Sequence, residues 1–179
     1  MNLKIDRPSE VDARASTLPS PKVCELRLQK ILCATDFSEC SQKAFHYAVS
    51  LARQFNAEIL LLHVFEPLPP QVGILEGAFM DTTIHEDAVR QLDEWRGRVS
   101  PAVQAKTAFR DGTATHKQIV AAAKEFGADL IVIGNHGRNA LGRVLMGNTA
   151  EKVVRFAPCP VLVIRQQEHD FISEESPSR

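Results

Sequence analysis

Several features that would identify a class of protein are missing from this sequence. No stretch approaches the roughly 18 consecutive apolar residues that a membrane-spanning helix needs, since the best run, Ile59 to Leu62, ends at His63. Lys and Arg total 21 against 22 for Asp and Glu, a net charge of −1 that provides no electrostatic attraction to nucleic acid or an anionic membrane. We therefore expect neither of these as a partner.

The cysteines form no C-x-x-C pair, and the opening residues, MNLKIDRPSEVDARAS, include acids and no apolar block. That opening is unlike a secretory signal or a transit peptide. We therefore expect reduced thiols and a cytoplasmic location. A redox role for Cys33 and Cys40 is the alternative. The four cysteines are Cys24, Cys33, Cys40 and Cys159.

The ends of the chain differ from its middle. Residues 1–27 are polar, charged and without periodicity, and residues 167–179 are similar, so we expect an N-terminal extension and a C-terminal tail. Residues 28–166 hold most of the apolar pattern, and the 44% hydrophobic content of the 179 residues suits one domain with a substantial core.

Apolar strand patterns and amphipathic helix patterns alternate through this middle segment. The sequence predicts strands at 30–35, 59–65, 106–109, 130–133 and 161–164. It predicts helices at about 41–55, 116–126 and 149–156, and one whose buried side carries Ile84, Ala88, Leu92, Trp95 and Val99. Alternation at this spacing indicates βαβ units, hence an α/β fold with a parallel sheet covered by helices on both faces.

Single residues predict where these helices begin and end. Ser38 is expected to cap the first helix and Asn56 to end it. Thr115 and Gln118 have the spacing of a capping box at the start of the third helix, and Gly127 is expected to stop it.

The fourth predicted strand ends at Gly134, and Gly137, Gly142 and Gly147 follow. Ligands of parallel α/β sheets lie beyond the carboxyl ends of the strands, and glycine lets a ligand approach the backbone without a Cβ in the way. This segment leads to a predicted helix start at Gly147-Asn148-Thr149, where exposed N–H groups favour an anion.

The glycine spacing therefore predicts a phosphate cradle, although it is neither a P-loop nor a G-x-G-x-x-G fingerprint. Asn148 and Glu151 also have capping-box spacing. The alternative is that the glycines only turn the chain and cap a helix.

Asp36 stands at the carboxyl end of the first predicted strand, within A-T-D-F-S. An acid there can accept a hydrogen bond from a ribose hydroxyl. The alternative is that it caps the following helix.

Taken together, these segments resemble the universal stress protein family over Lys30 to Arg165. The matching segments are K-I-L-C-A-T-D-F-S, L-L-H-V from Leu61 to Val64, and G-N-H-G-R-N-A-L-G-R-V-L-M-G-N-T-A-E-K-V-V-R followed by A-P-C-P-V-L-V-I-R. The ATP-binding branch of the family carries G-x2-G-x9-G-[ST], and Gly134, Gly137 and Gly147 occupy its glycine positions. Asn148 replaces the usual Ser or Thr and offers an amide in place of a hydroxyl.

The resemblance implies a single doubly wound, Rossmann-like sheet of five parallel strands in the order 3-2-1-4-5. It implies ATP or another adenine nucleotide as ligand, with or without Mg²⁺, and a homodimer formed through Val161 to Ile164. The implied nucleotide contacts are Ala34 and Val64 near the base, Asp36 at the ribose, Thr35 with no particular part of the nucleotide, and Gly134, His136, Gly137, Arg138, Gly147, Asn148 and Thr149 around the phosphates.

Efficient phosphoryl transfer needs a held metal and a positioned nucleophile, and the sequence offers no recognisable second carboxylate as a metal ligand. We therefore expect no catalytic residues and a nucleotide-binding stress-response regulator or signalling module. Two alternatives stay open: a slow ATPase of the same fold, and a dimeric interaction protein without nucleotide.

Overall fold

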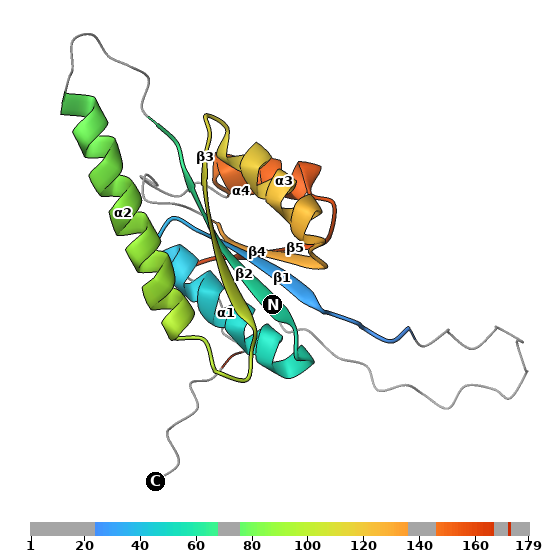
Figure 1. Ribbon diagram of the computed structural model, residues 1–179. Coiled ribbons are helices and arrows are strands. Elements are labelled where there is room, and N and C mark those ends of the chain that lie inside the picture. The colour runs from blue at the N-terminus through green and yellow to red at the C-terminus, as the bar shows by residue number, and fades with distance from the viewer. Residues whose placement is uncertain (1–23, 68–75, 136–145, 167–171, 173–179) are drawn as a thin grey trace, which may run out of the picture.

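The computed structural model describes residues 24–67, 76–135, 146–166 and 172, with only the backbone described for 76–82. Five strands form one sheet in the order β3-β2-β1-β4-β5, and every neighbouring pair is parallel (Figure 1). The predicted fold class and strand order are therefore confirmed. The strands are β1 (Lys30–Thr35), β2 (Glu58–Phe65), β3 (Ala105–Asp111), β4 (Leu130–Gly134) and β5 (Val161–Ile164).

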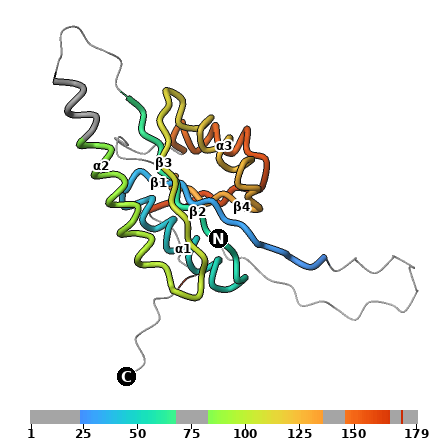
Figure 2. Tube along the Cα trace, viewed as in Figure 1, coloured from blue at the N-terminus to red at the C-terminus, as the bar shows by residue number. Residues whose placement is uncertain are grey.

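Four helices cover the two faces of this sheet. In Figure 1, α1 and α2 lie on one side and α3 and α4 on the other, and the trace in Figure 2 follows the same crossovers. None of the helices in the described part of the chain is both long and apolar enough to cross a membrane. The helices are α1 (Glu39–Phe55), α2 (Glu76–Gly97), α3 (Thr115–Phe126) and α4 (Asn148–Phe156).

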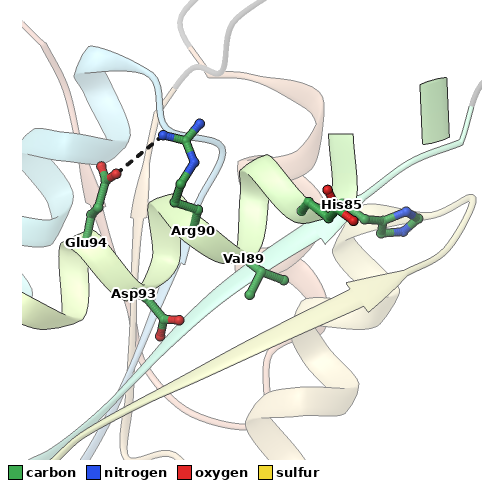
Figure 3. Close-up of a pocket in the computed structure, with 6 residues that line it drawn as sticks. His85, Val89, Arg90, Asp93 and Glu94 are labelled. Carbon is green, nitrogen blue, oxygen red and sulfur yellow. Dashed lines mark ion pairs between the residues drawn. The ribbon is translucent and has the colours of Figure 1, made fainter. Parts of the chain in front are cut away.

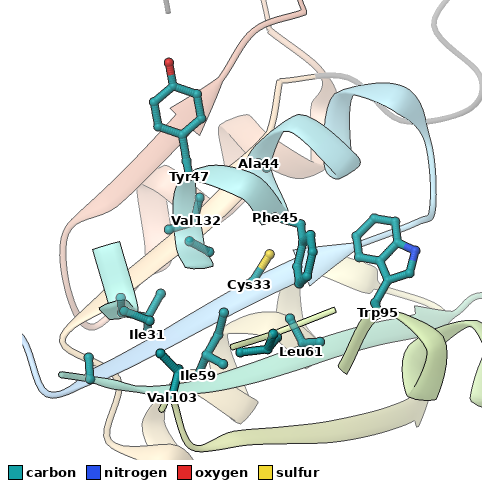
Figure 4. Packing of buried hydrophobic residues seen from close by; sticks show 14 of the residues in the cluster. Ile31, Cys33, Ala44, Phe45, Tyr47, Ile59, Leu61, Trp95, Val103 and Val132 are labelled. Carbon is teal, nitrogen blue, oxygen red and sulfur yellow. The ribbon is translucent and has the colours of Figure 1, made fainter. Parts of the chain in front are cut away.

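Alternate residues of the central strands enter two separate hydrophobic layers. Ile31 and Cys33 join the layer beneath α1 and α2, where they meet Phe45 and Trp95 (Figure 4). Leu32 and its neighbours on the other side join the layer beneath α3 and α4. Because both faces are buried, these strands are continuously apolar instead of alternating with polar residues.

Helix ends follow local chemistry where the sequence offers it. Ser38 caps α1, and its side chain accepts a hydrogen bond from the Ser41 N–H at 3.3 Å. Asn56 and Gly127 end α1 and α3 in the left-handed conformation, at φ 52° and 68°. These three predictions are confirmed.

The capping box predicted at Thr115 is wrong. Ala114 occupies the N-cap position of α3 and makes no side-chain capping bond. Thr115 is already helical, and its hydroxyl donates to Glu66 Oε2, 2.7 Å away. A carboxylate just beyond β2 therefore takes the hydroxyl that the local pattern had assigned to the helix backbone.

The buried side of α2 is also only partly as predicted. Ala88, Leu92 and Trp95 are buried, and Val99 is buried just beyond the helix end. Ile84, however, is 41% exposed. The adjacent His85 instead faces the sheet, where its ring contacts those of Phe65 and Phe109.

One described residue lies within the predicted C-terminal tail. Ile172 is partly buried and packs against the hydrophobic layer beneath α1 and α2. The tail therefore contributes at least one side chain to the core.

Candidate functional site

At the carboxyl edge between β1 and β4 the order in which successive strands are added to the sheet changes direction, although all the strands stay parallel. β1 pairs with β2 on one side and with β4 on the other, so the next crossovers run to opposite faces. Doubly wound sheets bind ligands at this kind of switch point. Asp36 and Gly134 stand at the ends of the two strands concerned.

Ala34 and Val64 border this edge on the side of α3 and α4. Ala34 is 5% exposed and belongs to the hydrophobic layer beneath those helices, while Val64 packs against the same layer. Ala34 pairs with Leu62, two residues before Val64, so the two predicted base contacts lie on one face of neighbouring strands.

Asp36 is half-buried in a tight turn between β1 and α1. Its Oδ1 accepts hydrogen bonds from the Ser38 N–H at 3.2 Å and from the Ser38 hydroxyl at 2.6 Å. Ser38, not Asp36, is the N-cap of α1. Asp36 therefore supports the cap through Ser38 and does not cap the helix itself.

An aromatic contact holds the same turn. Phe37 has a positive φ of 62°, which is unusual for a large side chain. Its ring stacks on His63 with centroids 4.7 Å apart and meets Trp95 edge-on at 5.5 Å. These ring contacts anchor Phe37, the residue that follows Asp36 in the turn.

Thr35 points away from this edge, toward α1. Its hydroxyl donates to Ser41 Oγ at 3.1 Å and accepts from the Phe37 N–H at 2.9 Å. Its carbonyl accepts from His63 Nδ1 at 2.8 Å. Its side chain is thus engaged within the protein, which leaves only its main chain to border a ligand.

Gly134 has a structural reason to lack a side chain. A Cβ built there would lie 3.1 Å from the carbonyl carbon and Sγ of Cys40 and from the Ser41 nitrogen. A side chain at this position would therefore press on the start of α1, whether or not a ligand also approaches it.

Gly147 is the N-cap of α4, with extended dihedral angles and no side-chain capping bond. Its N–H donates to the Asn135 carbonyl at 2.9 Å. Asn148 is the first residue of the helix and is exposed, and Thr149 is half-buried. The capping box predicted for Asn148 and Glu151 is therefore wrong, because the cap lies one residue earlier. The first N–H groups of a helix have no acceptor within it, so this turn can receive an anion.

The remaining predicted phosphate contacts, His136, Gly137 and Arg138, lie outside the described residues, as does Gly142. Asn135 was not among the predicted site residues, although it is 5% exposed and directly follows Gly134. A polar residue immediately after an apolar strand was the available signal.

A surface hollow on α2 lies apart from the carboxyl edge between β1 and β4. All its lining residues belong to that one helix, among them His85, Val89 and Arg90 (Figure 3). Arg90 is held by Asp87 at 2.7 Å and by Glu94 at 3.6 Å. The hollow includes none of the predicted site residues.

Burial shifts the pKa of several of the described side chains, including Cys33 and His116. All four cysteines are free, and burial raises the pKa of the Cys33 thiol to about 12. Burial, together with Lys152 and Lys117, lowers the pKa of His116 at the start of α3. Among the described residues, no group of three or more His, Cys, Asp or Glu could hold a metal ion.

Comparisons with known proteins agree on one family. Residues 27–165 match the sequence profile of the universal stress protein family. A universal stress protein of Methanocaldococcus jannaschii is 32% identical over 79% of this chain and 85% of its own length.

The structure of the universal stress protein UspA from Lactobacillus plantarum is 32% identical, covers 79% of this chain and 100% of its own, and superposes with a TM-score of 0.66. A universal stress protein solved in complex with cAMP shares the fold, with 22% identity, a TM-score of 0.60, and coverage of 79% of this chain and 100% of its own.

Proposed function

Because the chain belongs to the universal stress protein family, we propose that it binds an adenine nucleotide at the carboxyl edge between β1 and β4. One observation carries the proposal. The strand order makes β1 and β4 neighbours, so Asp36 and the Gly134–Asn135 end of β4, to which the N-cap of α4 is hydrogen-bonded, meet at one switch point.

The chemistry of the edge suits the parts of a nucleotide in order. Ala34 and Val64 offer an apolar border for the base. Asp36 offers a carboxylate to the ribose hydroxyls, and the first turn of α4, at Gly147, Asn148 and Thr149, offers main-chain N–H groups to the phosphates.

We assign ATP as the nucleotide, with Gly134, His136, Gly137 and Arg138 completing the phosphate contacts and Thr35 contributing main chain only. The glycine spacing of the ATP-binding branch supports this choice. That a universal stress protein of the same fold was solved with cAMP supports adenine in particular. Mg²⁺, where present, accompanies the phosphates.

The protein acts as a stress-response regulator in the cytoplasm, where nucleotide occupancy shifts its conformation or its partners. It assembles as a homodimer through β5. Within the described residues β5 pairs only with β4, and Val154 and Phe156 of the adjoining α4 are 48% and 54% exposed. A strand edge and apolar side chains together favour pairing with a second copy.

The decisive experiment is nucleotide release from denatured purified protein, identified by mass spectrometry, followed by calorimetric titration with ATP, ADP and AMP. We expect adenine nucleotide to bind, and binding to fall about tenfold or more in Asp36→Ala and in Gly137→Val, because each change removes or blocks an assigned contact. Arg90→Ala, on the α2 hollow, is the matched control and should bind normally.

No co-purified nucleotide and no heat of binding at millimolar ATP would refute the proposal. ATP turnover that disappears in both variants would instead establish a slow ATPase at the same site.

A further inference from the structure

Asn135 carries an acceptor atom that the described residues leave unsatisfied. Only 5% of the residue is exposed, and its Oδ1 is buried without a hydrogen-bond partner among them. Buried polar atoms are nearly always hydrogen-bonded, so an orphaned carboxamide oxygen requires an explanation. None of the contacts described for the fold supplies one.

The main chain of Asn135 is held on two sides. Its N–H donates to the Ile164 carbonyl at 2.6 Å, and its carbonyl accepts from the Gly147 N–H at 2.9 Å. The residue is thus tied both to β5 and to the N-cap of α4. Its backbone position is determined, and the side chain alone is left to adjust.

Strand register brings Asn135 and Asp36 to the same edge of the sheet. Ala34 pairs with Ile133 across β1 and β4, and both belong to the hydrophobic layer beneath α3 and α4. Asp36 and Asn135 each follow two residues later, one residue beyond the ends of their strands, so continuing the alternation of the two strands puts both toward that same face. Gly134, between Ile133 and Asn135, faces Cys40 on the opposite side, as this alternation requires.

An acceptor in this position selects the chemistry of its partner. A phosphate oxygen would be repelled by Oδ1, whereas a hydroxyl can donate to it. The apolar border assigned to the base consists of Ala34 and Val64, and Ala34 precedes Asp36 by two residues along β1. The N–H of Gly147, which is assigned to the phosphates, donates to the Asn135 carbonyl. The group between base and phosphates is the sugar.

We propose that Asn135 Oδ1 accepts a hydrogen bond from a ribose hydroxyl and, with the Asp36 carboxylate, forms a two-acceptor site for the sugar diol. The terminal torsion of an asparagine is broad, so the carboxamide can turn to meet the hydroxyl. This inference rests on the proposed nucleotide binding and adds to it a preference for ribonucleotides over deoxyribonucleotides.

The test uses Asn135→Leu, which keeps the size of the side chain and removes the acceptor. Removing an unsatisfied buried acceptor is neutral or stabilising in the free protein, so the melting temperature should stay constant or rise. ATP affinity measured by calorimetry on the full chain should nevertheless fall about tenfold, because one hydrogen bond is lost. Asn135→Ala replaces it if the leucine variant does not fold.

Titration with ATP, 2′-deoxyATP and 3′-deoxyATP gives the second readout. The wild type should bind the analogue that lacks the hydroxyl bonded to Asn135 about tenfold more weakly than ATP. The Asn135 variant should bind that analogue and ATP with equal affinity. Ser41→Ala, buried on the opposite face, is the control and should keep the wild-type ratio even if its melting temperature drops.

A wild-type chain that binds all three nucleotides equally, or an Asn135 variant with unchanged affinity and ratio, would overturn this inference alone. A wild-type chain that binds none of them would overturn the proposed function, and the inference with it.

Discussion

Gly134 and Cys40 approach so closely that a Cβ on the glycine would stand 3.1 Å from both the carbonyl carbon and the Sγ of the cysteine. Cys40 is in the first turn of α1 and Gly134 is the last residue of β4. The same glycine that belongs to the nucleotide motif therefore also lies where α1 packs tightly on the sheet. Motif and packing share one residue.

Gly134→Ala should destabilise the fold. Two of the three nearest atoms belong to the helix backbone and cannot move without shifting α1, so we expect a loss of about 1–3 kcal/mol in the free energy of unfolding, measured in urea. Gly97→Ala is the matched control, because no atom lies within 4 Å of a Cβ there. Equal stabilities of the two variants would show that α1 shifts to accommodate the added methyl group without a loss of stability.

Replacing Phe37 should separate its ring contacts from its backbone conformation. Both Phe37→Ala and Phe37→Gly remove the stacking on His63, but only glycine accepts a φ of 62° without steric cost. We expect the glycine variant to be the more stable of the two by about 1 kcal/mol in chemical denaturation. The reverse order would mean that the turn relaxes out of the left-handed region once the ring is gone.

Asn148→Ser should keep or strengthen ATP binding. The substitution restores the residue type of the family motif at the first position of α4 and leaves the main-chain N–H in place. Calorimetric titration of ATP measures the effect, and Asn148→Ala shows whether any side chain at this position matters. A large loss of affinity in the serine variant would show that the amide itself is needed.

Alkaline pH should weaken the protein through Cys33. Below pH 9.0, the ordinary pKa, the thiol is protonated in both the folded and the unfolded chain, and its contribution does not change with pH. Between pH 9.0 and about 12 the unfolded chain releases a proton that the folded chain retains. The free energy of unfolding should fall there by up to about 1.4 kcal/mol per pH unit.

Tyrosine and lysine side chains titrate in the same range, so the quantity to measure is the difference between the wild type and Cys33→Ala. That difference should shrink as the pH rises. A constant difference up to pH 11 would show that the folded chain ionises this thiol as easily as the unfolded one.

A charge on β5 should dissociate the proposed dimer. Val161→Glu places a carboxylate on the strand edge that a second copy would meet, and like charges would face each other across the interface. Sedimentation velocity should show a dimer for the wild type and a monomer for this variant. Thr107→Glu, on the opposite edge strand β3, should leave the dimer intact.

The amino-acid sequence determined the elements and much of their boundaries. The apolar run of β1, the cap at Ser38 and the left-handed ends at Asn56 and Gly127 all depend on chemistry within a few residues. The strand order followed from the resemblance to a family, because patterns along the chain do not say which strands become neighbours.

Only the tertiary structure decided which partner each of several polar or small residues contacts. Thr115 has the spacing of a capping box, yet Glu66, just beyond β2, accepts the hydrogen bond from its hydroxyl. Thr35 stands beside Asp36 in the sequence but faces α1, and a side chain at Gly134 would stand 3.1 Å from Cys40. Asn135 is distinguished by a buried side-chain oxygen that has no hydrogen-bond partner within the described part of the chain, which the sequence does not reveal. Caps and strand patterns act over one turn or one strand, whereas competition for a hydroxyl or for space depends on groups brought together from distant parts of the chain.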